Sequence, residues 1–147
     1  MAISPIRVTR KLDVIQENLE DLENFQDLEL EEFISNRHTQ KIVERTLEII
    51  FQAAIDTNEH ILKEGFQIKI EEYREGFREM GKVKVLSESL ATTLEESAGM
   101  KNVLIHFYDK VKPEIVYKAI KMTLHDYPMY QEQILNYLET LREKDND

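Results

Sequence analysis

Residues 35–64 read SNRHTQKIVERTLEIIFQAAIDTNEHILKE and contain neither glycine nor proline. The stretch is the longest helix candidate in the chain, because nothing in it interrupts helical geometry. One apolar stripe recurs along it at helical spacing (Val43, Leu47, Ile50, Ala54 and Ile61), and a second apolar surface adds Ile42, Ile49, Phe51, Ile55 and Leu62. A helix that is apolar on two sides is typical of the centre of a bundle or of a subunit interface.

A first helix is expected before this segment. Ser4 is a preferred capping residue and Pro5 fits the first helical position. An apolar stripe then continues to about Asn24 at spacings of three and four residues (Val8, Leu12, Ile15, Leu19 and Leu22). Asp27 can cap a short second piece that contains Leu28, Leu30, Phe33 and Ile34.

Further helices are expected after Gly65, which is predicted to end the long helix. The next helix would stop at Gly81, another would run from about Leu86 towards Ile105, and Pro113 would start a fresh one. Pro128 is predicted to break the pattern before a last helix. The sum is an all-α, up-and-down bundle of five to six helices, with a single domain over residues 1–142 and a frayed acidic tail over residues 143–147.

Composition narrows the class of protein further. The 147 residues suit one domain, and only 4 Gly and 3 Pro argue against an all-β fold, whose turns would need both. The chain has no Cys, which excludes disulfides and thiol chemistry. No apolar run suits a membrane span or a secretion signal, so a cytoplasmic protein is expected.

Two common kinds of site are missing from the sequence. No histidine follows a glutamate at the third position, so the sequence lacks the Glu-x-x-His pairs of bundle metal sites, and no metal site is expected. No glycine pattern fits a phosphate-binding loop. His38, His60 and His125 lie among polar or helix-end residues and are interpreted as surface or capping histidines.

Four chemically distinct side chains fall within eight residues near the end of one expected helix: Lys101, Asn102, His106 and Tyr108. Asn102 shares a helical face with His106, whereas Lys101 is about 140° away from it on an ideal helix. A histidine at a helix C-terminus is favoured in its charged form. The plain structural alternative is that Asn102 caps the helix, Lys101 is solvated, and His106 and Tyr108 are half-buried.

Three small residues, Ser97, Ala98 and Gly99, precede this cluster. Glycine inside a helix costs about 1 kcal/mol relative to alanine, so it usually permits close packing. Two explanations remain equally open: a dimer seam that brings two clusters together, or a tight crossing inside one subunit.

Residues 99–108, GMKNVLIHFY, resemble the signature of the HepT-like branch of the HEPN superfamily. That signature is Arg, a polar residue that is usually Asn, three apolar residues, His, any residue and Tyr. Residues 109–117, DKVKPEIVY, resemble the family's link into its next helix. The specific match covers about residues 97–120, and length and helix order are compatible over nearly the whole chain.

The resemblance implies a homodimeric all-α ribonuclease that needs no metal or cofactor. It also implies a toxin paired with a minimal nucleotidyltransferase antitoxin. On these positions His106 would be the acid/base and Asn102 would help to fix the site, while Tyr108 would accept AMP from the antitoxin. An imidazole can take the proton of a ribose 2′-hydroxyl so that the oxygen attacks the adjacent phosphate, while a cation stabilises the added charge.

The sequence departs from the family signature at Lys101, which stands where the signature has Arg. Lysine keeps the charge but lacks the planar, bidentate grip of a guanidinium on phosphate. Two hypotheses therefore stand: an active ribonuclease with Lys101 in place of Arg, or a catalytically weakened or inactive dimeric helical interaction protein.

Charge is unevenly distributed along the chain. The formal net charge of −10 disfavours broad coating of nucleic acid, because phosphate backbones need a basic surface. Residues 12–32 contain nine acids and no Lys or Arg, whereas residues 101–121 contain five lysines and two acids. The basic part of this acidic protein coincides with the motif, which is compatible with a small, local RNA site.

Overall fold

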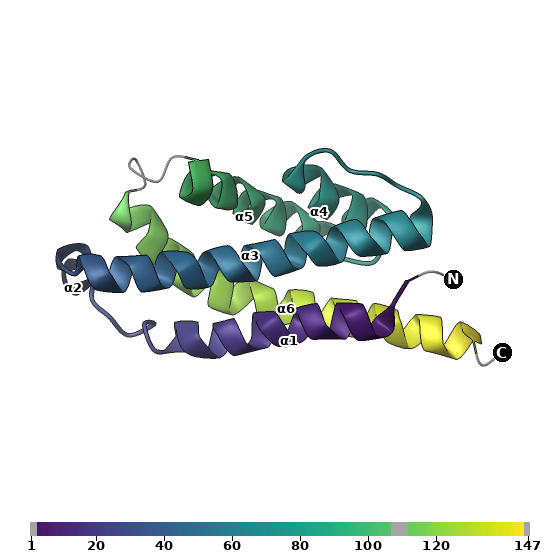
Figure 1. Cartoon of the computed structure of the whole chain (residues 1–147), viewed down its shortest axis with the longest axis horizontal. Helices are drawn as coiled ribbons and strands as arrows, with labels where there is room; N and C mark the ends of the chain where they lie inside the picture. The colour runs from purple at the N-terminus through teal and green to yellow at the C-terminus, as the bar shows by residue number, and fades with distance from the viewer. Residues whose placement is uncertain (1–2, 107–111, 146–147) are drawn as a thin grey trace.

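The computed structural model describes residues 3–106 and 112–145, and for residues 100–106 and 145 it describes the helix but not the side chains. Within this part of the chain there are six helices and no strand, which confirms the predicted all-α bundle. The helices are α1 (Pro5–Glu23), α2 (Leu30–Ser35), α3 (Arg37–Phe66), α4 (Tyr73–Lys82), α5 (Glu88–His106) and α6 (Pro113–Asp145). The long helices α1, α3, α5 and α6 lie side by side and alternate in direction (Figure 1).

The first helix forms as its sequence predicts. Ser4 adopts an extended conformation, its hydroxyl accepts a hydrogen bond from the Arg7 N–H, and Pro5 follows at the first helical position. All five apolar residues of the predicted stripe are buried, and α1 packs along α3. The cap and the stripe together fix where α1 begins and which face it turns inward.

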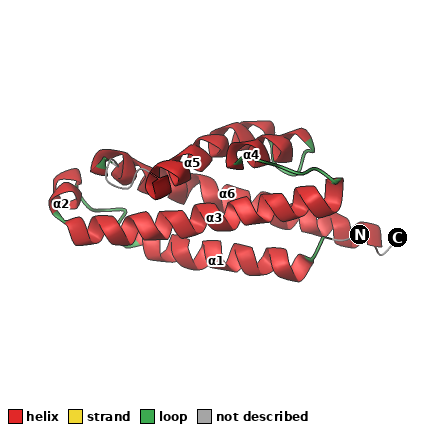
Figure 2. Ribbon diagram, turned by 45° about the horizontal axis from the view of Figure 1, so that its top comes forward, coloured by secondary structure: helices red, strands yellow, loops and turns green. Residues whose placement is uncertain are grey.

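Helix α3 is the centre of the bundle, because it packs against every other helix (Figure 2). Its buried residues lie on both predicted apolar surfaces and include Val43, Leu47, Ile50, Phe51 and Ile55. Of the two expectations for this two-sided helix, a central position within the subunit is the one confirmed.

Two predicted breaks are wrong. Pro128 lies inside the continuous helix α6, at an exposed position between Tyr127 and Tyr130, which are both buried. Proline in a helix interior costs about 3 kcal/mol, and these two buried aromatic anchors hold the helix on either side of it. Helix α6 is described as far as Asp145.

Gly65 does not end α3 either. The helix continues to Phe66, and Gln67 takes the left-handed conformation that terminates it (φ 54°). A Cβ on Gly65 would lie 2.5 Å from Ile3 Cδ1, so the glycine gives Ile3 room against the helix.

Polar groups tie α3 to its neighbours. The buried Tyr130 hydroxyl on α6 donates to Asn58 Oδ1 (2.7 Å) and lies 3.1 Å from the Ala54 carbonyl oxygen. His60 Nε2 accepts the Ser4 N–H (3.0 Å), and burial together with the nearby Arg7 lowers the pKa of His60. The lowered pKa favours the neutral ring that this bond requires. His60 is therefore a capping histidine, as its polar setting suggested.

None of the helices in the described ranges combines the length and the hydropathy that a transmembrane span requires.

Candidate functional site

The segment that resembles the HepT-like signature, residues 101–108 (hereafter the motif), begins on the last two turns of α5. Lys101, Asn102 and His106 belong to this helix, so register fixes which side of α5 each position occupies. Tyr108 lies outside the described residues. Position 102 follows Glu95 by seven residues, and position 106 follows Gly99 by seven residues. Seven residues are close to two full turns, so these four positions form one line along the same side of α5, to within about 20° for each pair.

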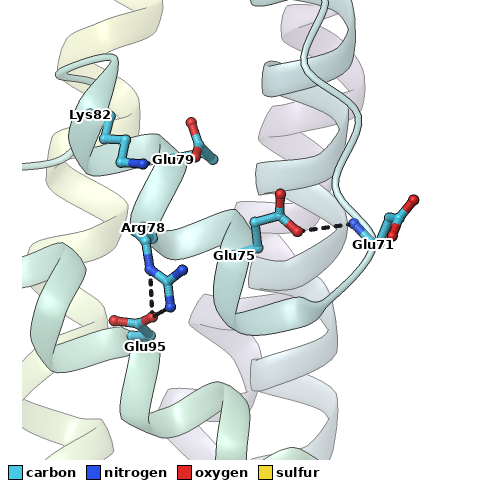
Figure 3. A network of polar contacts seen from close by, with 6 residues as sticks. All are labelled: Glu71, Glu75, Arg78, Glu79, Lys82 and Glu95. Atoms are coloured by element: carbon cyan, nitrogen blue, oxygen red, sulfur yellow. Dashed lines mark hydrogen bonds and ion pairs between the residues drawn. The ribbon is translucent and has the colours of Figure 1, made fainter.

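Helix α4 runs antiparallel along this line of α5. A Cβ on Gly81 would lie 2.7 Å from the Ala91 Cβ, which shows how closely the two helices cross there. One turn on, Arg78 Nε donates to Glu95 Oε1 at 3.0 Å (Figure 3). Another turn on, the Arg74 guanidinium covers Gly99. The space beside Gly99 is therefore filled by the Arg74 side chain of the same subunit.

The opposite side of α5 faces α6. The hydroxyls of Ser97 and Tyr127 are 2.8 Å apart, and Tyr127 is buried against Phe51 and Tyr130 (ring centroids 5.8 and 5.9 Å away). Burial raises the pKa of Tyr127, so its hydroxyl stays protonated and can act as a donor. Position 101 follows Ser97 by four residues, so register places Lys101 on this α6 side, away from the line of Asn102 and His106.

A groove of about 180 Å³ lies between α5 and α6 beside this bond. Its walls are mostly apolar and include Phe51, Ile115 and Met122, with Glu96, Lys118 and Asp126 at its edges. Lys112, Lys118 and Lys121 are exposed at the start of α6. These three of the five lysines counted around the motif are thus available to an anion approaching this end of the bundle.

Two further candidate features in the described residues are a metal site and His125. No group of three or more His, Cys, Asp or Glu comes together there in a way that could hold a metal. His125 Nδ1 is 2.9 Å from Asp126 Oδ1 on an exposed turn of α6, which fits its interpretation as a surface histidine.

Sequence reasoning missed Arg74 and Tyr127. Both act on α5 from other helices, 25 and 30 residues away from their contacts on it in the chain, so no local spacing could reveal them. The only sequence signal was the glycine at position 99, which predicted a close approach without naming what approaches.

Comparison with known proteins identifies the family. Residues 15–136 match the family described as ribonuclease HepT-like. The chain belongs to this family. It is also 39% identical over 145 residues to the tRNA nuclease HepT of Aphanizomenon flos-aquae (strain 2012/KM1/D3), a match that covers 99% of this chain and 98% of that protein.

Solved structures share the fold of this HepT-like chain. The tri-AMPylated Shewanella oneidensis HEPN toxin, solved in complex with MNT antitoxin, superposes with a TM-score of 0.80 at 18% identity, over 88% of this chain and 97% of that one. A toxin–antitoxin crystal structure with AMP-PNP superposes with a TM-score of 0.78 at 18% identity, over 87% of this chain and 97% of that one. The Bacillus subtilis cytosolic protein YutE, of unknown function, superposes with a TM-score of 0.78 at 16% identity, over 94% of this chain and 92% of that one.

Proposed function

We propose that this HepT-like protein is an endoribonuclease toxin that cleaves RNA without a metal ion at a site built on the end of α5. The observation that carries the proposal is its full-length similarity to a tRNA nuclease, combined with the placement of Asn102 and His106 on one line of that helix. His106 is the acid/base of this site, Asn102 helps to fix it, and Lys101 adds positive charge from the α6 side.

The proposed reaction is an internal transfer at one phosphodiester. His106 takes the proton of the ribose 2′-hydroxyl, and the freed oxygen attacks the neighbouring phosphorus. The bond from phosphorus to the 5′-oxygen breaks, and that oxygen leaves as a hydroxyl after taking a proton. The products are one fragment with a 2′,3′-cyclic phosphate and one with a 5′-hydroxyl, and no water or metal is consumed in this step.

Incubation of the purified protein with bulk bacterial tRNA tests this proposal. We expect cleavage that persists in excess EDTA and gives fragments with 2′,3′-cyclic phosphate ends, identified by mass spectrometry. Products with 5′-phosphate ends, or loss of cleavage in EDTA, would contradict the mechanism. No cleavage at all would favour the alternative, a non-catalytic helical protein in which Lys101 has replaced the motif arginine.

We propose further that a minimal nucleotidyltransferase antitoxin controls the toxin by attaching AMP to Tyr108. The support is the family membership of this chain and the tri-AMPylated toxin that shares its fold. Tyr108 follows His106 by two residues in the sequence, so a bulky anionic group on it would occlude the proposed site. We place the action of both toxin and antitoxin in the cytoplasm. Incubation with such an enzyme and ATP should add AMP to the wild type and leave Tyr108→Phe unmodified.

The active form is proposed to be a homodimer that uses the exposed face of α6. Ile115, Met122 and Met129 recur every seven residues on this helix and are 44%, 45% and 41% exposed. Such a line of exposed apolar side chains is typical of a helix-to-helix contact between subunits. It also borders the groove beside α5, which would bring the two motifs of a dimer towards one another.

Met122→Glu is expected to convert the dimer into a monomer, because two carboxylates would be buried at the contact. The matched control is Leu135→Glu, which introduces the same charge at an equally exposed position (48%) of the same helix, about 120° around from the stripe. Light scattering after gel filtration gives the mass of each. Equal masses for both variants and the wild type would contradict this interface.

A further inference from the structure

Arg74, in the first turn of α4, lies directly over Gly99 of α5. A Cβ built on Gly99 would be 3.1 Å from Arg74 Cζ and 3.2 Å from its Nε, and closer still to Nη2. The guanidinium therefore occupies the space that any other side chain at position 99 would claim. The contact puts an arginine on the line of α5 that continues to Asn102 and His106.

The charge of Arg74 is not neutralised by the described residues. Arg78, one turn further along α4, is bound by Glu95. Glu75, next to Arg74 in sequence, accepts the backbone N–H of Glu71 (3.3 Å; Figure 3). Within the described ranges Arg74 is exposed and has no hydrogen bond or ion pair, so its five donors are available to an anion.

The order of contacts between α4 and α5 leads from Arg74 to the motif. Gly81 meets Ala91, Arg78 meets Glu95 and Arg74 meets Gly99, in steps of about one turn. Helix α4 begins at Tyr73, so the end of α5 extends past it (Figure 1). Position 106 is then about 10 Å further along the same side of α5. A phosphate bound to Arg74 at hydrogen-bond distance would extend along this side of α5 towards position 106.

Position 101 lies on another side of α5. It is about 160° around α5 from Gly99 and about 140° from His106. The contact of Ser97 with Tyr127 shows that this side of the helix turns to α6. Position 101 is therefore off the line of positions 99 and 106, whereas the Arg74 guanidinium lies on that line at Gly99.

We propose that Arg74 binds the phosphate of the RNA that is cleaved at His106, and so supplies the guanidinium that the motif lacks. This inference rests on the proposed ribonuclease function. A guanidinium holds two phosphate oxygens at once and stabilises the charge that they gain when the 2′-oxygen attacks phosphorus. The substitution of Lys for Arg at position 101 is then compatible with an active enzyme.

Cleavage of bulk tRNA by matched variants tests the role of Arg74. We expect Arg74→Ala to lower kcat/KM by about 10²-fold, as loss of one charge-stabilising donor does, with Arg74→Lys in between. The control is Arg78→Ala, the same change one turn away on the same helix, which should cost less than about threefold because Glu95 already neutralises that side chain. Gly99→Ala should give a rate between those of the wild type and Arg74→Ala, since the new methyl group pushes the guanidinium away from α5 but leaves its charge in place.

RNA binding by variants that also carry His106→Ala gives a second readout, independent of cleavage. The probe is a fluorescein-labelled single-stranded RNA, titrated at several salt concentrations, with circular dichroism to verify folding. Loss of one phosphate contact should reduce the slope of log K against log salt by about 0.7 for Arg74→Ala, and Arg78→Ala should leave it unchanged.

The two readouts separate the failure of this inference from the failure of the proposed function. Cleavage that needs His106 but responds equally to Arg74→Ala and Arg78→Ala overturns the role of Arg74 alone. Absence of cleavage overturns the ribonuclease proposal, and the binding slopes then decide whether Arg74 holds phosphate. A wild-type protein that neither cleaves nor binds RNA overturns both.

Discussion

His106→Ala is expected to lower RNA cleavage by about 10²- to 10⁴-fold, the range that a positioned general acid/base contributes. In the proposed reaction the imidazole accepts the proton of the 2′-hydroxyl, and alanine offers no group that can do so. The change should act on kcat more than on KM, because the phosphate contacts of the RNA come from other residues. Initial rates on tRNA over a range of concentrations separate the two constants.

The matched control is His125→Ala, which removes the same ring from an exposed turn of α6. This variant should cleave at the wild-type rate. Helix content and the urea midpoint should be unchanged in His125→Ala, since that ring is exposed, and the same two measurements verify that His106→Ala is folded. Equal rates for His106→Ala and the wild type would remove His106 from the mechanism and, with it, the proposed site.

The helices of this protein could be predicted because their sequence signals are local. The stripes at spacings of three and four residues on α1 and α3 mark the faces that the structure buries. Ser4 and Pro5 likewise mark the start of α1 within a few residues of chain. Such signals depend only on helical geometry, so they survive the packing of the bundle.

The wrong predictions concern residues whose role depends on distant partners. Pro128 is tolerated in α6 because Tyr127 and Tyr130 are buried beside it, and Gly65 is needed for Ile3, which is 62 residues away. A local interpretation assigns both residues to helix ends. The tertiary contact outweighs the local preference in each case.

The candidate site divides in the same way. The line of Asn102 and His106 on one helix follows from spacing alone, whereas Arg74 comes from another helix and is recognised only through its contact with Gly99. Sequence reasoning therefore found the residues proposed for proton transfer and missed the arginine proposed to act with them.

Phe77→Ala is expected to lower the free energy of unfolding by about 3–5 kcal/mol. Phe77 is fully buried in α4, and its ring meets Tyr130 of α6 edge-on, with centroids 6.2 Å apart and planes inclined at 69°. Removal of the ring opens a cavity where α4 joins the core. The total free energy of unfolding of a natural domain is about 5–15 kcal/mol, so this loss would be a large part of the stability.

Urea unfolding followed by far-ultraviolet circular dichroism measures the effect, at one fixed protein concentration because a dimer unfolds in a concentration-dependent way. Phe25→Ala is the matched control: it removes the same ring from a half-buried position in the link after α1, and about 1 kcal/mol is expected. Equal midpoints for the two variants would show that Phe77 does not anchor α4. If Phe77→Ala does not fold, Phe77→Leu is the variant to measure, because leucine keeps most of the apolar volume. Its free energy of unfolding should fall by less than about 2 kcal/mol.

The same anchor links stability to the site. Arg74 is one turn before Phe77 on α4, so its place over Gly99 depends on how firmly α4 is held against the core. If loss of Phe77 loosens α4 locally, the guanidinium moves away from α5 before the bundle unfolds. Phe77→Leu should then lower RNA cleavage at urea concentrations where its overall helix content still equals that of the wild type. Cleavage that falls only in step with helix content would instead mean that α4 and the bundle unfold together.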